Sequence, residues 1–363
     1  MRIAVLGGGN GAFAAAGDLT LAGHEVRLWR RDRQAVAQHR AAGGGICIAD
    51  FRGRHQTHPT LITAVIAEAV RGAELIICPT PATAHRDIAA RLAPHLSEGQ
   101  VVFLPPGSLG SVVFAKAALA AGNRAEVAFA ESGTLPWLTR KRGAFEAAIT
   151  VRAKRLPTGV FPRRLAAPAL EVIARAFPGA IEACGDVLSA SLLNAGPIIH
   201  PPLIIMNAAP LEHFERWDVH NEGTQPAVRR VSDALDAERI RIRRALGYGE
   251  PHFPLANHYA REGEEWMYGR GSHDKLTGSG DWREKITLTE HRYMLEDVGI
   301  GLSLLASVAR LAAVATPLVD AFLALGSAIC GADFQRTGRP LASLGLADLG
   351  PAELRDLMER GLR

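Results

Sequence analysis

The sequence has little lysine and no clustered cysteines. Only five of its 41 basic residues are lysine, the basic residues are scattered, and the net charge is +4. Nucleic-acid binding requires a basic patch, so we expect no nucleic-acid partner. The cysteines lie far apart without metal-type spacing, which predicts buried thiols in a reducing compartment and no metal site. They are Cys47, Cys78, Cys184 and Cys330.

Long uninterrupted apolar runs are also missing. The most apolar late segment, residues 302–330, contains Arg310, Pro317 and Asp320, which argues against a membrane span. A strand-like run follows Met1 at once, so we expect no signal peptide and a cytoplasmic protein that does not bind a membrane. With 363 residues, 48% hydrophobic and 21% charged, the chain is typical of a globular protein with two domains.

The first residues carry the fingerprint of a dinucleotide-binding turn. Residues 3–6 are apolar, as in a buried parallel strand, and Gly7, Gly9 and Ala12 follow at the fingerprint spacing. Small residues are needed because the turn is tight and backbone N–H groups approach a pyrophosphate. The predicted cofactor-binding residues of the turn are Gly7, Gly9, Asn10, Gly11 and Ala12.

The segment that follows the turn supports this interpretation. We expect a helix over about residues 10–22, with its positive dipole end toward the phosphates. Gly23 is a C-terminal stop, and residues 26–29 begin a second strand. The alternative is an ordinary glycine-rich turn without a ligand.

Two arginines stand where many NAD enzymes carry an acidic residue. Arg30 and Arg31 follow the second strand, and guanidinium groups bind a 2′-phosphate that a carboxylate would repel. We therefore favour NADP(H), with NAD(H) possible. In the alternative interpretation, Asp32 binds the ribose and both arginines are solvated.

Strands and helices alternate through the first half of the chain. The expected strands lie at residues 61–65, 75–78, 101–104, 127–130 and 147–151. This pattern predicts an α/β Rossmann domain, doubly wound around a mainly parallel sheet, over residues 1–185. Pro81 follows one strand end and is expected to border the nicotinamide, unless residues 79–82 are simply a proline-rich turn.

Helical patterns dominate from residue 186 onward. We expect helices over residues 187–209, 226–246, 289–311 and 317–329, and so a mostly α-helical domain over residues 186–363 that forms the other wall of the cleft. Residues 263–280 are rich in Gly, Ser and charge, which is typical of a long loop or lid. The last of these helices could pack in a core or in a homodimer interface.

Candidate chemistry lies in this helical half. His200 lies among apolar residues, near Pro197, Pro201 and Pro202, which should kink or interrupt a helix. Histidine is the usual general acid/base near neutral pH. A hydrogen-bonded core histidine is the alternative. Asp297 has apolar neighbours and needs a partner such as an imidazolium, unless it and Glu296 form a solvated acidic turn. On a helix, Arg292 would be offset from Asp297 but could still reach the same cleft.

The chain resembles the octopine/nopaline (opine) dehydrogenase family, in particular the bacterial N-(1-carboxyethyl) amino-acid dehydrogenases. The likeness covers nearly the whole length. It is carried by Gly7-x-Gly9-Asn10-Gly11, Asn194…His200-Pro201, Asp236-Ala-Glu-Arg239, Arg292-Tyr293…Glu296-Asp297-Val298, Thr316-Pro317-Leu318, Asp333-Phe334 and Gly338-Arg339…Leu344-Gly345-Leu346.

The resemblance implies a Rossmann domain and a helical domain with the active site between them. It also implies reductive condensation of an amino acid with a 2-keto acid, His200 and Asp297 as the catalytic pair, and Arg292 as a substrate-carboxylate ligand. Asn194 could position a carbonyl or the nicotinamide, or cap the helix. Arg30 departs from the acidic residue of NAD-using relatives, which supports NADP(H).

Two other functions remain open. A ketopantoate reductase-like or hydroxy-acid dehydrogenase would reduce a ketone without an amine and would use a lysine, of which the helical half has only Lys275 and Lys285. A non-catalytic NADP(H)-binding regulatory module would bind the cofactor without turnover.

Overall fold

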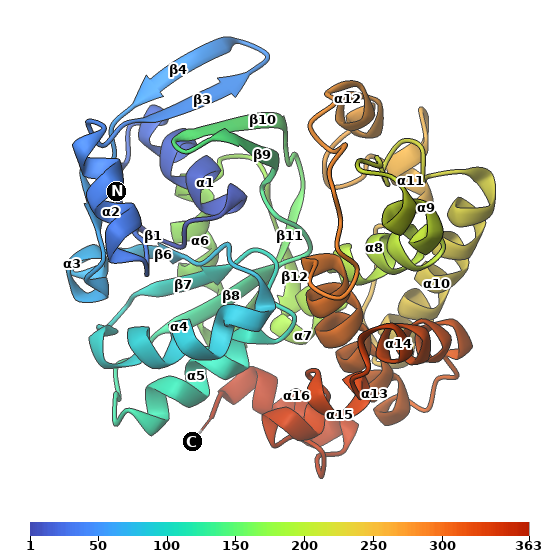
Figure 1. Cartoon of the computed structure of the whole chain (residues 1–363). Helices are drawn as coiled ribbons and strands as arrows, with labels where there is room; N and C mark the ends of the chain where they lie inside the picture. The colour runs from blue at the N-terminus through green and yellow to red at the C-terminus, as the bar shows by residue number, and fades with distance from the viewer. Residues whose placement is uncertain (363) are drawn as a thin grey trace. The chain divides into compact units, whose positions relative to one another are not determined.

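The computed structural model describes residues 1–362 (Figure 1). The chain forms two compact units. The N-terminal unit contains residues 1–80 and 84–190 with a short C-terminal stretch from Glu359, and the helical unit contains residues 81–83 and 191–358. The division falls after Ala190, later than the boundary expected near residues 183–186, because β12 (Ile181–Asp186) still pairs with the sheet of the N-terminal unit. Residues 81–83 belong to the helical unit, which the sequence did not predict.

The N-terminal unit is built on an eight-stranded sheet with the order β12-β11-β8-β7-β6-β1-β2-β5. All neighbouring strands are parallel except β8 and β11, which are antiparallel. The predicted Rossmann fold with a mainly parallel sheet is therefore confirmed. The strands are β1 (Arg2–Leu6), β2 (Glu25–Trp29), β5 (Leu61–Thr63), β6 (Leu75–Ile77), β7 (Val101–Leu104), β8 (Ala128–Ser132), β11 (Leu156–Phe161) and β12.

The centre of this sheet lies in the core of the unit. Four residues of β1, Ile3 to Leu6, are fully buried, as their continuous apolar pattern predicts for a strand covered on both faces. Strand β1 pairs with β2 on one side and with β6 on the other. The strand order thus reverses beside β1, and ligands of such sheets bind beyond the carboxyl ends of the strands at this point.

A second, four-stranded sheet with the order β4-β3-β10-β9 was not predicted. The strand expected at residues 147–151 exists, but it belongs to this second sheet and adds nothing to the main one. It pairs antiparallel with its hairpin partner β9 and parallel with β3, so its own pairing keeps it out of the main sheet. The strands are β3 (Ile46–Asp50), β4 (Gly53–Thr57), β9 (Trp137–Gly143) and β10 (Glu146–Arg152).

Helix α1 (Asn10–Leu21) lies between the two sheets (Figure 1). The Trp137 indole donates to Asp18 at 2.7 Å, and Arg152 pairs with the same carboxylate at 2.6 Å, which ties the second sheet to α1. The other helices of the unit are α2 (Arg33–Ala41), α3 (Ile66–Val70), α4 (His85–Leu92), α5 (Gly110–Ala120), α6 (Ala166–Ala176) and α7 (Val187–Ser191), with 3-10 turns at Ala93–His95 and Arg163–Leu165. A further 3-10 turn, Ala82–Ala84, begins in the helical unit and ends in this one.

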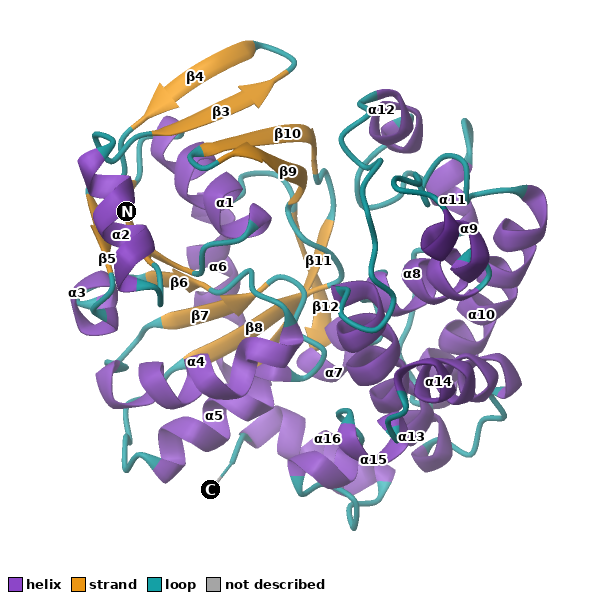
Figure 2. Cartoon of the chain, viewed as in Figure 1, coloured by secondary structure: helices purple, strands orange, loops and turns teal. Residues whose placement is uncertain are grey.

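The helical unit contains no strand among its described residues, apart from one isolated bridge between Trp217 and Glu284 (Figure 2). The predicted mostly α-helical domain is confirmed. Its elements are α8 (Gly196–Ile205), α9 (Ala208–His213), α10 (Pro226–Ala245), α11 (Ala256–Tyr259), α12 (Ser272–Gly278), η4 (Tyr293–Leu302), α13 (Ser303–Leu311), α14 (Pro317–Cys330), α15 (Phe334–Thr337), η5 (Leu341–Leu344) and α16 (Pro351–Arg360).

Two of the expected long helices are interrupted. The helix expected over residues 187–209 breaks before Gly196 and again at Asn207, so it forms α7, α8 and part of α9. The helix expected over residues 289–311 begins at Tyr293 and its first ten residues form the π-helix η4. Gly299 and Gly301 lie inside η4 and weaken the preference for an ordinary α-helix.

Residues 263–280 are more ordered than the expected loop. They include α12, and Trp266, Met267 and Tyr268 are buried. Their apolar side chains pack into the helical unit, an outcome that glycine and charge counting could not indicate. The expected long loop therefore differs in containing a helix at residues 272–278, and its role as a lid stays a prediction.

Apolar stretches of the chain pack into the protein. Val319, Phe322, Leu323 and Gly326 of α14 are buried. Among residues 1–362, the helical stretch Val187–Ile205 is long and apolar enough to cross a membrane, but 67% of its apolar window is buried, as in a core helix. The bent pair formed by Pro317–Cys330 and Phe334–Leu344 passes the same test only when it is taken as one span.

The cysteines differ from the prediction in one respect. None of the four forms a disulfide, but only Cys78 is fully buried, while Cys47, Cys184 and Cys330 are half-buried.

Candidate functional site

The glycine turn leaves space for a ligand backbone. Gly7 has φ +136°, which favours glycine, and a Cβ there would lie 2.9 Å from Thr80. A Cβ on Gly11 would lie 3.1 Å from Leu135 and Pro79, and Ala12 is fully buried, so both keep α1 close to its neighbours. A Cβ on Gly9 would meet nothing within 4 Å. The turn therefore has the open side that a pyrophosphate needs, and it fits a dinucleotide.

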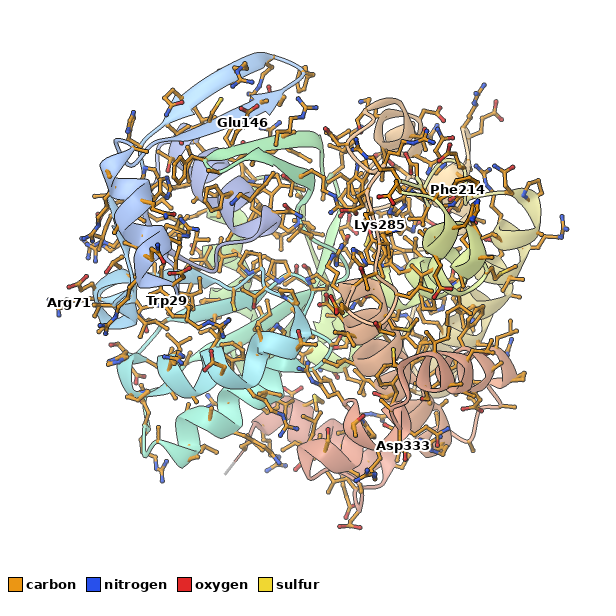
Figure 3. All side chains as sticks on the ribbon, viewed as in Figure 1. Trp29, Arg71, Glu146, Phe214, Lys285 and Asp333 are labelled. Carbon is orange, nitrogen blue, oxygen red and sulfur yellow. The ribbon has the colours of Figure 1, made fainter. Side chains whose placement is uncertain are left out.

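The residues after β2 have different roles. Figure 3 labels Trp29, the last residue of β2, and Arg30 follows it directly. The Arg30 Nε lies 3.3 Å from the position of a Cβ on Gly8, so its guanidinium lies beside the glycine turn. Arg31 instead forms an exposed ion pair with Asp87 at 3.0 Å. The Asp32 carboxylate accepts the N–H groups of Gln34 and Ala35 and so caps α2.

In the helical unit, His200 and Asp297 form a short buried pair. The His200 Nδ1 lies 2.7 Å from the Asp297 Oδ2, although the two residues are 97 positions apart, and their side chains are 13% and 5% exposed. Burial raises the pKa of Asp297 to about 7, and the charge of Arg292 opposes this shift. With Asp297 ionised, Nδ1–H donates to the carboxylate and fixes the imidazole tautomer.

Close packing of α8 on η4 brings these two residues together. A Cβ on Gly196 would overlap the Asp297 Oδ1, and a Cβ on Gly301 would overlap Pro197. Pro201 and Pro202 follow His200 but lie within α8, which runs on to Ile205. These two prolines therefore do not interrupt the helix, and the expected kink stays a prediction. The break comes earlier, before Gly196. The prolines remove two N–H donors from the helix.

Arg292 directly precedes the π-helix η4, which carries Asp297. In an α-helix, residues five apart are offset by roughly 140° around the axis, and hydrogen bonds between residues five apart in a π-helix make this offset smaller. The charge of Arg292 acts on Asp297, and a role of Arg292 at the same site stays a prediction. The Arg292 side chain is 41% exposed and its Nη1 lies 3.5 Å from the Glu296 Oε2.

Two aromatic neighbours of His200 were missed from the sequence. The Tyr293 ring is fully buried and stacks on the His200 imidazole, with ring centroids 3.6 Å apart and planes at 12°. The Nε2 atom of His220 lies 3.1 Å from the Tyr293 hydroxyl oxygen. The His220 ring is nearly perpendicular to the His200 ring. The guanidinium of Arg292 lies 4.7 Å from the Tyr293 ring centre. Tyr293 stands in the family motif that begins at Arg292, although no role was predicted for it, and His220 had no signal in the sequence.

Asn194 lies at the break before α8. It is buried, and its Oδ1 accepts the N–H of Gly196 at 3.0 Å, so it supports the start of the helix.

The two lysines that a ketone reductase could use have other positions and contacts. Lys275 is in α12. Lys285 donates to the Phe214 carbonyl at 3.1 Å, and Figure 3 labels both Lys285 and Phe214. Within residues 1–362, no group of three or more His, Cys, Asp or Glu side chains could hold a metal ion.

Residues 81–83 are held by two buried charged side chains of the helical unit. The Glu296 Oε1 accepts the N–H of Ala82 at 2.9 Å, and Arg339 Nη2 donates to the Ala82 carbonyl at 2.7 Å. Pro81 is therefore followed by a residue, Ala82, whose backbone N–H and C=O are both hydrogen-bonded to side chains. Glu296 is thus no solvated acidic residue, and neither is Asp297.

Comparison with known proteins identifies the family. A curated opine dehydrogenase from Arthrobacter sp. (strain 1C) is 32% identical over 98% of both chains. The chain belongs to the opine dehydrogenase family. It is therefore an NAD(P)-dependent oxidoreductase that acts on the CH–NH group of donors. The family model described as NAD/NADP octopine/nopaline dehydrogenase, alpha-helical domain, matches residues 183–330, and a model described as NADP oxidoreductase coenzyme F420-dependent matches residues 2–103.

Solved structures of opine dehydrogenases share the fold. Octopine dehydrogenase with NADH and L-arginine has a TM-score of 0.72, with 17% identity over 99% of this chain and 98% of that one. Yersinopine dehydrogenase with bound NADP+ has a TM-score of 0.65, with 17% identity over 99% and 98% of the two chains.

Proposed function

We propose that this opine dehydrogenase condenses an amino acid with a 2-keto acid, such as pyruvate, and reduces the resulting imine, with NADP(H) preferred over NAD(H). The observation that carries the proposal is the buried 2.7 Å contact between His200 and Asp297. A histidine whose tautomer is fixed by a carboxylate is suited to general acid/base catalysis. Octopine dehydrogenase, a relative in fold, binds L-arginine, which supports an amino acid as one substrate.

His200 exchanges protons with the substrates through Nε2. The amino group attacks the keto carbon, water leaves, and an imine forms between the two substrates. His200 protonates the departing oxygen, and Asp297 stabilises the imidazolium form of the ring. The stacked Tyr293 ring keeps the imidazole plane in place and favours its protonated form. When bound, the nicotinamide supplies the hydride that reduces the imine, and no metal is required.

Other residues bind the substrates and the cofactor. Arg292 binds a substrate carboxylate, because its guanidinium is part exposed and lies against Tyr293, the residue that stacks on His200. Asn194 orients a substrate carbonyl or the nicotinamide from the start of α8. The cofactor is held by Gly7, Gly9, Asn10, Gly11, Ala12, Arg30, Arg31 and Pro81. A cytoplasmic location and a homodimer complete the proposal.

The test is NADPH oxidation with a panel of amino acids, each with and without pyruvate or another 2-keto acid. We expect oxidation only when both substrates are present. His200→Ala and Asp297→Asn should lower kcat by roughly 10²- to 10⁴-fold, the range that general acid/base catalysis contributes. Neither change should weaken NADPH binding. Asp348→Asn, an exposed aspartate outside the site, is the matched control and should leave kcat unchanged.

Two results would overturn the proposal. Oxidation with the keto acid alone, unaffected by any amine, would identify a ketone reductase. Cofactor binding without turnover, together with unchanged behaviour of the His200 variant, would identify a regulatory module.

A further inference from the structure

A lysine from the second sheet approaches the glycine turn. The backbone N–H of Lys141, in β9, donates to the Asn10 Oδ1 at 3.0 Å, which fixes β9 against the start of α1. The Lys141 Nζ lies 3.9 Å from the centre of the Phe13 ring. The Arg30 guanidinium lies 5.4 Å from the centre of the same ring. Two cations from elements far apart in sequence therefore converge beside the dinucleotide turn.

Neither cation has a carboxylate partner among residues 1–362. Arg30 donates to the backbone carbonyl of Ala35 at 2.9 Å, and the Lys141 ammonium lies over the Phe13 ring. Both side chains are half-buried. Burial lowers the pKa of Lys141, and the charge of Arg30 lowers it further. Burial also lowers the pKa of Arg30, against the attraction of Asp32. Two like charges that are partly desolvated and unpaired repel each other, and a bound anion would relieve this repulsion.

The position of the pair favours one anion. In this fold, the adenosine ribose binds at the end of the second strand, and Arg30 is the first residue after β2. The pyrophosphate binds at the N-terminus of the first helix, where backbone N–H groups and the helix dipole already attract it. A phosphate on the ribose has no such backbone site and depends on side-chain cations.

We propose that Lys141 is a specificity-determining residue that binds, together with Arg30, the 2′-phosphate of NADP(H). This inference rests on the proposed preference for NADP(H) and extends it to a residue of the second sheet. Asn10 is the positioning residue, because its side chain holds the backbone of Lys141 at the start of α1. Phe13 supports both cations with its ring face while leaving their N–H groups able to donate.

The experiment measures binding rather than turnover. Dissociation constants for NADP+ and NAD+ are determined by isothermal titration calorimetry on the full-length wild type and on Lys141→Met. Methionine keeps an unbranched apolar stem on Phe13 and removes the charge. The loss of one charged hydrogen bond is worth roughly 1.5–3 kcal/mol, which corresponds to roughly ten- to hundredfold in Kd. We expect that loss for NADP+ and no change for NAD+.

Two further variants separate charge from folding. Arg142→Gln removes one charge from the exposed neighbouring residue and should leave both constants unchanged. Lys141→Arg retains a cation and should retain the preference for NADP+ even if the methionine variant folds poorly. Thermal unfolding of each variant without cofactor checks that the fold is intact.

The outcomes distinguish this inference from the function on which it rests. Equal weakening of NADP+ and NAD+ by Lys141→Met would overturn it and place the lysine on the pyrophosphate. Unchanged NADP+ affinity in Lys141→Met, with a wild type that prefers NADP+, would overturn the role of Lys141 alone. A wild type that binds NAD+ as tightly as NADP+ would overturn the cofactor preference itself.

Discussion

Glu296 is a buried carboxylate next to a second buried carboxylate, Asp297. Burial, and then the charge of Asp297, raise the pKa of Glu296 to about 7, while Arg292 and the Ala82 N–H oppose the shift. Glu296 also forms a hydrogen bond with the backbone, because its Oε1 accepts the N–H of Ala82. The residue therefore holds the segment at residues 81–83 in place, and its raised pKa predicts a stability that depends on pH.

The expected pH dependence has a definite sign. The pKa of Glu296 is raised from 4.5 in the unfolded chain to about 7 in the fold, so the folded state favours the protonated form. The resulting stability is fully present below about pH 4.5 and is lost as the pH rises through about 7. Glu296→Gln keeps an acceptor for Ala82 and removes the titration. The unfolding temperature of this variant minus that of wild type should therefore be larger at pH 8 than at pH 5.

The measurement is the unfolding temperature of both proteins at the two pH values. Glu171→Gln, an exposed glutamate in α6, serves as the control and should show no such difference. An equal difference between Glu296→Gln and wild type at both pH values would contradict the raised pKa.

At the scale of elements, two glycines determine how closely α8 and η4 pack. Gly196 and Gly301 lie where a methyl group would overlap Asp297 and Pro197. The contact between His200 and Asp297 therefore depends on the close packing of two helices, and on no local motif.

The motif Asp236-Ala-Glu-Arg239 of α10 forms hydrogen bonds to other segments of the helical unit. Arg239 pairs with Asp236 at 2.6 Å and donates to the carbonyls of Leu192 and His252. Glu238 accepts the N–H groups of Leu318 and Val319, each at 3.0 Å, at the N-terminus of α14. Family resemblance singled out this motif, and the structure assigns these side chains to holding elements together.

Loss of the Glu238 side chain should therefore weaken the attachment of α14. Glu238→Ala takes the partner from the buried N–H of Val319 and the part-buried N–H of Leu318, and removes a negative charge from the start of a helix. We expect a loss of about 2 kcal/mol in the free energy of unfolding. Urea denaturation measures it, with Glu171→Ala expected to stay within about 0.5 kcal/mol of wild type. A Glu238→Ala protein as stable as wild type would contradict the capping role.

At the scale of the whole molecule, chain connectivity and compact units do not coincide. Residues 81–83 pack with the helical unit, while the chain from Glu359 returns to the N-terminal unit, where Glu359 pairs with Arg163 at 3.1 Å. The N-terminal unit is thus closed by residues from the other end of the chain. A division of the chain into residues 1–185 and 186–363 could not predict that either segment belongs to the other unit.

Cofactor binding should stabilise the folded protein according to cofactor preference. A ligand at about 100 times its Kd raises the free energy of unfolding by about 2.7 kcal/mol. At equal concentrations, NADP+ should therefore raise the urea midpoint more than NAD+ does. Equal shifts by the two cofactors would contradict the preference. Arg30→Met should remove the difference between them, because it loses one of the two unpaired cations beside the turn.

The sequence by itself determined the features that depend on neighbouring residues. The β1–α1–β2 unit, the glycine turn and the helical character of the second half follow from local apolar periodicity and from small residues at fixed spacing. His200 and Asp297 could be selected separately, because each is a polar group in apolar surroundings. The family resemblance paired them.

Only the tertiary structure decided the remaining features, because they depend on contacts between distant residues. The second sheet forms by pairing of strands from residues 46–57 and 137–152, and this pairing places Lys141 beside Arg30. The stacking of Tyr293 on His200 and the contact of His220 with Tyr293 likewise join different elements. Periodicity describes which face of an element is buried, but not which element covers it, so the site could be assembled only in three dimensions.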